Sequence, residues 1–536
     1  MLLTGSDKKT ENAESIFKQL LDEILKRRLQ PEDKYEVAAI LESMGWNDDR
    51  ATHVFGSDDI FSLASDLWDA TQRKVTFVPF ETVKKKSLLF IFLQAMRNFL
   101  RGLIFALPMA ISVMSMLVLR FSLWSYEELT LELATSIAIG TILSFLTVGG
   151  FTQSIARRGF FYIMQDYYNM ARKITFYFIK LGYVMCIVIA AVILLFNVIF
   201  EMFPFRMVIV IVLYYLLLTA IWLSVTVMYI LRKEYAFTGL LIAGIVLVFI
   251  LFKVFEMDII VSQIISLAAV SIAGLILVIY YFISAEKRSE KGIAPKLPRM
   301  SITLYSVMPY FIYGFFYFLF IYIDRIIAWS TNDTGYMPYL IWFRGPYELG
   351  LDLALLTLMI PMGLIEVIVG NLMEQLETSQ KFCSIDDIFT LAPKYIKYYF
   401  KRLVTVVASS VVCAVGIYFA ALWVDKNAHQ VLKADFSYGS TTWTVFILAL
   451  AGYALLTAAL MNSIILFSVS QPELVNQSIF PAIIANVVVG FLLSRWFRYE
   501  FAIFGLLAGT LVFLVLSTKN VLRALKNLDY YLYATS

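Results

Sequence analysis

The sequence contains very few histidines and cysteines, the residues that most often bind zinc or carry redox chemistry. Its 536 residues include 2 histidines, His53 and His429, and 3 cysteines, Cys186, Cys383 and Cys413. No two of them have the spacing of a zinc site, and nothing supports a disulfide framework. Two of the cysteines lie inside apolar runs, where a thiol behaves as a small apolar group. We therefore expect no metal and no other cofactor.

Nucleotide-binding glycine loops and nucleophile elbows are also missing. Without such motifs the chain is not expected to hydrolyse nucleotides or to act as an enzyme of those classes. Charged residues make up only 16% of the chain, and the formal net charge of +4 gives no indication of nucleic-acid binding. The polar N-terminus does not predict a cleavable signal peptide.

What the sequence does contain is a series of long apolar runs. The chain is 60% hydrophobic, with a mean hydropathy of +0.76. A membrane span needs about 20 apolar residues to cross about 30 Å of hydrocarbon. Helices satisfy their own backbone groups in lipid, so we predict an all-α polytopic membrane protein of about twelve spans. The predicted spans are 102–124, 130–152, 174–200, 205–231, 236–256, 259–283, 302–328, 347–372, 402–424, 441–468, 474–494 and 501–518.

The distribution of basic residues predicts the orientation. Most lysines and arginines of the membrane part fall in connections on one side, which places both termini in the cytoplasm. Residues 285–300 form the most polar of these connections and divide the spans into six and six. This layout predicts two pseudo-symmetric six-helix bundles, over 102–284 and 301–536, around a central cavity.

The region before the first span is different in character. Residues 1–80 are polar with helical apolar spacing, which predicts a small soluble helical domain on the cytoplasmic side that docks a partner and has no chemistry. Residues 81–101 predict a basic amphipathic helix in the headgroup layer, in contact with membrane lipids. Its basic residues are Lys84, Lys85, Lys86, Arg97 and Arg101.

Acidic residues within the spans are functional candidates, because an ionisable group near the bilayer centre costs about 2.5–3.5 kcal/mol. Asp324 lies late in the seventh span, and Asp352 and Glu366 lie in the eighth. Glu348 and Asp352, spaced i and i+4, share one helix face, and Glu366 falls near that face about four turns further on. Such a stripe suits a cation site or an aqueous cavity. We predict Asp324, Asp352 and Glu366 as ion-coupling residues.

Basic residues in or beside the spans predict a cationic surface along the path of a transported molecule. They are Arg101, Arg157, Arg158, Lys180, Arg325 and Arg344. Simpler interpretations stay open, because Lys180 is close enough to the start of its span to snorkel to the headgroups. The neighbours Asp324 and Arg325 are equally placed to form an interfacial pair at the outer end of theirs. The abundant aromatic rings suit either lipid contact or stacking on sugars.

The stretch Tyr313–Trp329, which reads YGFFYFLFIYIDRIIAW, resembles the seventh span of the Pel-type exopolysaccharide exporters, the PelG family. The segment from Tyr347 to Pro361 is similar to that family's eighth span. Similarity extends to residues 147–158 and to the C-terminal LKNLDYY. The N-terminal helical domain departs from the family pattern.

This resemblance implies a member of the multidrug/oligosaccharidyl-lipid/polysaccharide (MOP) transporter superfamily. Such proteins rock two six-helix bundles between inward-open and outward-open states, usually driven by ion gradients. It further implies a bacterial cytoplasmic-membrane protein that exports or flips a polysaccharide or lipid-linked glycan, beside a cytoplasmic glycosyltransferase.

Three alternatives stay open at this point. A transporter of the same superfamily could export small molecules or drugs. A membrane glycosyltransferase or polymerase would need an acid or base outside the membrane, where Glu127 and Glu128 lie, although no outer connection is long enough to build an acceptor site. A scaffold that docks a synthase through its N-terminal domain is the third.

Overall fold

The computed structural model describes residues 16–25, 31, 33–75, 88–288, 299–332, 337, 339–382, 388–431, 439–528 and 530. The chain divides into two compact units, Met1–Ile91 and Phe92–Ser536. Three lysines of the predicted interfacial helix, Lys84, Lys85 and Lys86, lie outside the described residues, as does Cys383.

The first unit is a small helical bundle. Residues 16–25 are helical and are followed by α2 (Lys34–Ser43), α3 (Asp48–Phe55) and α4 (Ile60–Val75). The side chain of Asn47 caps α3, because its Oδ1 accepts a hydrogen bond from Arg50 N at 3.0 Å. Apolar residues from all four helical segments, including Ile24, Leu41 and Leu67, form one core. This unit therefore packs on its own hydrophobic faces.

The second unit consists of long apolar helices. Within the described residues, eleven helical segments are long and apolar enough to cross a membrane. They are α6 (Leu131–Met164), α7 (Tyr168–Phe200), α8 (Phe205–Ile230), α9 (Glu234–Phe249) with the π turn η1 (Ile250–Val254), α10 (Ile259–Arg288), α11 (Met300–Trp329), α12 (Gly345–Leu355) with the 3-10 turn η2 (Leu356–Leu358) and α13 (Met359–Phe382), α14 (Ile388–Val431), α15 (Ser440–Ser468), α16 (Pro472–Trp496), and η4 (Tyr499–Ala502) with α17 (Ile503–Lys526). The predicted all-α polytopic fold is confirmed.

The first predicted span corresponds to α5 (Leu88–Leu119), which is not among those eleven segments. Its 32 residues would extend about 48 Å at 1.5 Å per residue. Arg97 and Arg101 lie in this one continuous helix, whereas the sequence predicted a separate interfacial helix that ends at 101. The large apolar side chains of its first turns, such as Leu89 and Phe92, are exposed, as expected for contact with lipid.

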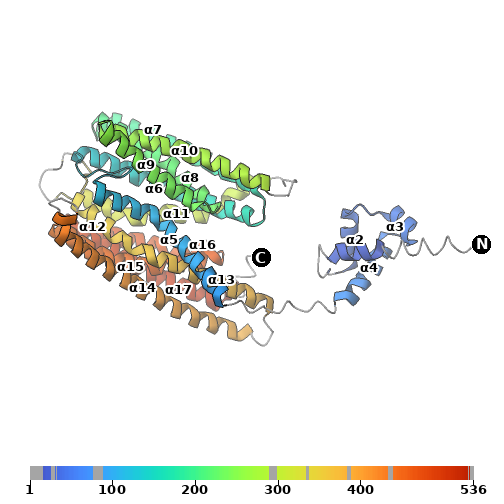
Figure 1. Ribbon diagram of the computed structural model, residues 1–536. Coiled ribbons are helices and arrows are strands. Elements are labelled where there is room, and N and C mark those ends of the chain that lie inside the picture. Colours follow the sequence, from blue (N-terminus) through green and yellow to red (C-terminus); the bar gives the residue numbers. More distant parts are fainter. Residues whose placement is uncertain are drawn as a thin grey trace, which may run out of the picture. The chain divides into compact units, whose positions relative to one another are not determined.

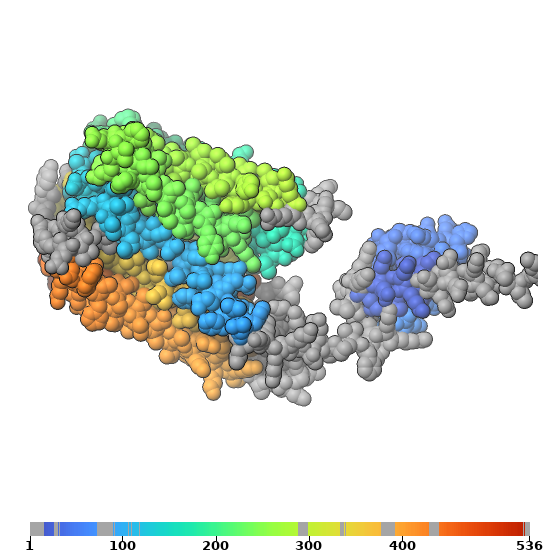
Figure 2. All heavy atoms as spheres, viewed as in Figure 1, coloured from blue at the N-terminus to red at the C-terminus, as the bar shows by residue number. Residues whose placement is uncertain are grey.

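The long helices form two lobes with separate cores. The N-lobe consists of α6–α10, and its core includes Phe178, Tyr214 and Phe282. The C-lobe consists of α11–α17, and its core includes Phe320, Phe446 and Phe513. In Figure 1 the two lobes appear as a teal-to-green group and a yellow-to-red group, and α5 runs obliquely across both. Figure 2 shows the atoms of α5 lying over the seam between the lobes.

The eighth span is interrupted near its middle. Pro361, at the start of α13, has no N–H group to donate to the carbonyl of Thr357, so the helix tightens into η2 at that point. Glu366 lies 14 residues beyond Asp352, which is about 21 Å along the helix axis at 1.5 Å per residue, so the two carboxylates do not form one local site.

Candidate functional site: a buried charge cluster in the C-lobe

A group of ionisable side chains lies buried where the last turns of α11 pack against the first turns of α12. We call this group the C-lobe charge cluster, and it consists of Asp324, Arg325, Glu348 and Asp352. The α12 helix begins with Gly345 and Pro346, and a proline near the first position suits a helix start because its missing N–H is not needed there. Glu348 falls in the first turn, where the helix dipole favours a carboxylate.

Arg325 is the centre of the cluster. Its Nη1 bonds to Glu348 Oε2, and its Nη2 donates to Asp352 Oδ1 at 3.2 Å. Because Glu348 and Asp352 are one turn apart on α12, a single guanidinium reaches both of them. Trp329, one turn beyond Arg325 on α11, donates its indole N–H to Glu348 Oε1 at 2.9 Å. Both oxygens of Glu348 are therefore bonded.

Asp324 has a different partner, although it adjoins Arg325 in sequence. Successive residues of a helix point about 100° apart, so Asp324 faces Tyr347 of α12, whose hydroxyl donates to Asp324 Oδ2 at 2.8 Å. Asp324 is fully buried and Arg325 is 7% exposed. Neither side chain lies at the surface of the lobe, where an interfacial pair would have to be.

The cluster is not fully satisfied within the described residues. Asp324 Oδ1 and Arg325 Nε are buried and have no hydrogen-bond partner there. A buried polar atom without a partner costs about 1–3 kcal/mol, so the two atoms reduce the stability of the cluster. The members of the cluster differ in solvent exposure: the side chain of Asp352 is 48% exposed, whereas that of Arg325 is 8% exposed.

Glu366 and Arg101 form a second, separate group. Arg101 of α5 and Glu234 of α9 are the charged residues that act electrostatically on the Glu366 carboxylate of α13. The group therefore joins residues of both lobes and of α5. Glu366 is exposed and does not join the C-lobe charge cluster.

The remaining predicted cations are dispersed. Arg157 Nη2 donates to Ser470 Oγ at 3.1 Å and lies over the ring of Tyr310, while Arg158 donates to Ser306. Arg344 Nη2 donates to Thr331 O at 2.8 Å and lies over the ring of Tyr499. Lys180 is exposed on α7, and no described residue forms an ion pair with it. The structure does not bring the six cations into one continuous surface.

The acidic pair considered for an enzyme lies on the surface between α5 and α6. Arg120 is 3.7 Å from Glu127 and 4.0 Å from Glu128, and Glu128 also accepts a hydrogen bond from Tyr126. These are exposed ion pairs of modest energy, and the described residues build no enclosed site around them.

Close backbone contacts join the two lobes at one place and join α5 to the C-lobe at another. A Cβ atom on Gly314 of α11 would lie 2.1 Å from the carbonyl oxygen of Gly149 of α6. A Cβ atom on Gly102 of α5 would lie 2.7 Å from Gly363 Cα of α13. No larger residue fits at these positions without displacing a helix. The contacts are topologically equivalent, because each joins the first span of one half to the second span of the other.

Near the ends of the helices, the lobes are joined by single polar bonds. At the predicted outer end, Tyr339 donates to Glu132 Oε1 at 3.1 Å, and Phe343 N donates to Thr135 Oγ1 at 3.2 Å. At the predicted inner end, Arg157 bonds to Ser470, and Gln94 of α5 donates to Glu374 at 3.1 Å. Single hydrogen bonds of this kind form and break readily. The spacing of the helices at the glycine contacts is instead fixed by the backbone atoms that touch there.

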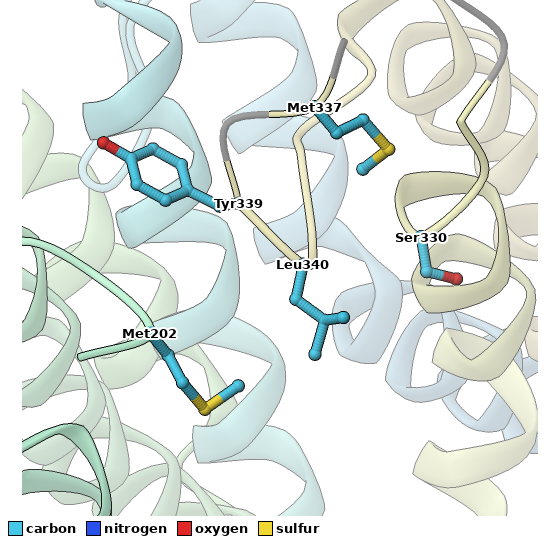
Figure 3. A pocket seen from close by; sticks show the side chains of 5 residues that line it. All are labelled: Met202, Ser330, Met337, Tyr339 and Leu340. Atoms are coloured by element: carbon cyan, nitrogen blue, oxygen red, sulfur yellow. The ribbon is translucent and has the colours of Figure 1, made fainter. Parts of the chain in front are cut away.

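A pocket of about 550 Å³ lies beside the outer-end bonds. It is lined by Met202, between α7 and α8, and by Ser330, Met337, Tyr339 and Leu340, between α11 and α12 (Figure 3). The lining contains two thioethers and no carboxylate, and none of the cluster residues is part of it. The pocket is therefore a feature of the lobe junction and not of the charge cluster.

Replacing Thr135 with valine tests the outer-end junction. The change keeps the shape of the side chain but leaves the Phe343 N–H without its acceptor, at a cost of about 1 kcal/mol. We expect the amide of Phe343 to exchange with deuterium severalfold faster in hydrogen-exchange mass spectrometry. Thr141→Val is the matched control on the same helix, because the Thr141 hydroxyl bonds to Ile137 O of its own helix. Equal exchange in both variants would contradict the assignment.

Comparison with solved structures identifies the architecture of the second unit. A mutant of the Vibrio cholerae MATE transporter VcmN is 13% identical, with a TM-score of 0.52 over 82% of this chain and 98% of that chain. The second unit has the fold of MATE transporters. Another MATE mutant, 14% identical, gives a TM-score of 0.51 over 81% of this chain and 97% of that one. A MATE structure in complex with MaD3S, also 14% identical, gives 0.50 over the same shares.

These neighbours are described as MATE proteins, one of them explicitly as a transporter. The likeness agrees with the predicted all-α polytopic fold, and nothing in the comparisons supports the Pel-type family in particular. No family model and no curated protein matches the sequence.

Sequence reasoning missed two features of the C-lobe. It noted Glu348 only as a companion of Asp352, whereas Glu348 is the most buried partner of Arg325. It also gave no role to Arg495, which donates to Ser330 O at 3.0 Å and to Ile327 O at 3.2 Å and so caps the last turn of α11. The i, i+4 spacing of Glu348 and Asp352 was the feature of the sequence that pointed to Glu348. The contact of Arg495 could not be predicted from any local pattern, because it joins α16 to the end of α11.

Proposed function

We propose that this protein is a membrane transporter that works by alternating access. The observation that carries the proposal is the MATE-like arrangement of two helical lobes. Their contacts support it, because close backbone contacts at the glycines combine with single polar bonds toward either end. Such an arrangement lets the two ends separate in turn while the glycine contacts act as a pivot.

In this proposal the C-lobe charge cluster couples transport to an ion gradient. An ionisable group buried in a membrane protein is costly, and Asp324, Arg325 and Glu348 are all buried. Asp324, Asp352 and Glu366 are the proposed coupling carboxylates. Arg101, Arg157, Arg158, Lys180, Arg325 and Arg344 are the proposed cations of the transport path, in separate places along it.

For the cargo we propose a polysaccharide or a lipid-linked glycan, on the basis of the Pel-type sequence pattern in the seventh and eighth spans. A cytoplasmic glycosyltransferase would be the partner that supplies it, with the N-terminal helical unit as the docking module and the bacterial cytoplasmic membrane as the location. Export of small molecules is the second candidate, and the likeness to MATE transporters favours it at least as strongly.

Flux measurements on the full chain in liposomes test the proposal. We expect one of two probes to move faster than in protein-free vesicles when a pH or sodium gradient is imposed. The probes are a fluorescently labelled oligosaccharide and ethidium, and they separate the two cargo classes. Arg120→Met, in an exposed ion pair far from the cluster in sequence, should leave the flux unchanged. The absence of gradient-driven flux for both probes would overturn the proposal.

A further inference from the structure

Two neighbouring arginines of α6 reach across the lobe junction to the C-lobe. Arg157 Nη2 donates to Ser470 Oγ, in the connection between α15 and α16, at 3.1 Å. Arg158 donates to Ser306 of α11. The guanidinium of Arg157 also lies over the ring of Tyr310, with 5.1 Å between its Cζ and the ring centroid. Because Ser306 and Tyr310 are one turn apart on α11, both arginines meet one face of that helix.

The positive charge of these two arginines is not balanced by a nearby carboxylate. In the part of the chain that the structure describes, neither Arg157 nor Arg158 forms an ion pair. Each donates only to one neutral hydroxyl there, although a guanidinium has five N–H groups. Arg157 is exposed and Arg158 is partly buried. Two adjacent charges with spare donors therefore face the seam between the lobes, where they repel each other and attract an anion.

The C-lobe contributes a buried aromatic residue and a hydroxyl to the same place. Tyr310 is 7% exposed, and its ring lies 5.6 Å from that of Phe467 between centroids. The Tyr310 hydroxyl lies beside Ser470, and both guanidinium groups act on it electrostatically. The two arginines thus stand against a packed surface of the other lobe, which fixes the direction from which a ligand can reach them.

Phosphate is the anion that these donors suit best. A guanidinium binds two oxygens of a phosphate through parallel N–H bonds, and such charge-assisted bonds are about twice as strong as bonds between neutral groups. A phosphate oxygen therefore competes well with the serine hydroxyls that the arginines contact. Two guanidinium groups also match the charge of a phosphate monoester, which is about −1.5 to −2 at neutral pH. A carboxylate would balance only one of them.

We propose that Arg157 and Arg158 form a binding site for a phosphate group at the predicted inner end of the lobe junction. The phosphate belongs to a lipid headgroup or to a soluble molecule, and both present the same oxygens to the arginines. On binding, the guanidinium groups exchange Ser470 and Ser306 for phosphate oxygens, which opens two polar bonds between the lobes. The inference goes beyond the proposed function, because the site binds its ligand whether or not any cargo is transported.

Titrations of the full chain in dodecyl maltoside, a detergent without phosphate, test the site with two probes. Fluorescence anisotropy follows a dye-labelled short-chain phosphatidic acid, and calorimetry follows inorganic phosphate. Binding of the lipid alone assigns the site to a headgroup, and binding of inorganic phosphate assigns it to a soluble source. In either case Arg157→Gln, Arg158→Gln should bind about tenfold more weakly. Arg157→Lys, Arg158→Lys keeps both charges without the forked donors and should be intermediate.

The matched control is Arg172→Gln, Lys173→Gln. It also removes two adjacent positive charges, near the start of α7 at the same end of the N-lobe, and Arg172 is already paired with Glu286 at 3.4 Å. This variant should bind both probes as the wild type does. Equal binding by the two glutamine double variants, or no binding of either probe by the wild type, would overturn the inference.

A change at Ser470 separates a binding role of the arginines from a purely structural one. Ser470→Gly removes the hydroxyl that competes with phosphate, and glycine suits the φ of 56° at this position, so the fold should be kept. We expect phosphate or lipid binding to become severalfold tighter. Unchanged or weaker binding would contradict the exchange of serine for phosphate. Because no flux is measured, a failure of the transport proposal leaves these results unaffected.

Discussion

Arg325→Met is expected to destabilise the C-lobe by about 3–5 kcal/mol, because it removes the positive charge from a buried ion pair and leaves the Glu348 carboxylate uncompensated. Glu348 is as buried as its partner, so water cannot replace the lost bond. Methionine has a similar length and fills the space of the arginine stem, so the loss is electrostatic and not a cavity. Equilibrium unfolding in mixed detergent and SDS micelles measures the change.

The double variant Arg325→Met, Glu348→Gln should recover much of this stability, because neither side chain is then charged. Arg120→Met is the matched control, since Arg120 is 42% exposed and its ion pairs face solvent. A surface pair contributes about 0–1 kcal/mol, so this variant should unfold almost as the wild type does. If Arg325→Met were no more destabilising than Arg120→Met, the cluster could not be buried as described.

Gly314→Ala is expected to cost about 2–3 kcal/mol and to impair any motion of the lobes, because the added Cβ would meet the Gly149 carbonyl oxygen at 2.1 Å. The added Cβ would meet a backbone oxygen, and neither atom can move through a change of rotamer. The helices α6 and α11 must separate by about 1 Å to restore an ordinary contact. Unfolding in mixed micelles measures the first effect, and the distance between dyes placed on the two lobes measures the second.

The chain provides a matched control in Gly416, within α14, where an added Cβ meets nothing within 4 Å. Alanine favours a helix over glycine by about 1 kcal/mol, so Gly416→Ala should be neutral or slightly stabilising. Gly149→Ala approaches the same contact from the other side, at 2.5 Å from Gly314 O, and should behave as Gly314→Ala does. Opposite behaviour of these two variants would refute a shared pivot.

Much of the fold was predictable because the bilayer restricts the choices. A run of about 20 apolar residues in lipid can be satisfied only as a helix, so the all-α polytopic fold followed from hydropathy. The α11 helix, Met300–Trp329, begins and ends within two residues of the predicted 302–328. The start of the first span was predicted too late, at residue 102. The helix α5 begins at Leu88 and includes the basic residues Arg97 and Arg101, which precede the apolar run.

Residue type and spacing alone thus determined that this chain spans a membrane, that charge lies within its seventh and eighth spans, and that Asp352 shares a face with Glu348. The tertiary structure alone decided which charges meet. Arg325 and Glu348 are 23 positions apart, yet they bond because α11 and α12 fold back on each other. Asp352 joins Arg325, whereas Glu366 lies on α13, about 21 Å further along the span at 1.5 Å per residue. Periodicity describes one helix at a time, whereas a charge cluster depends on how two helices pack.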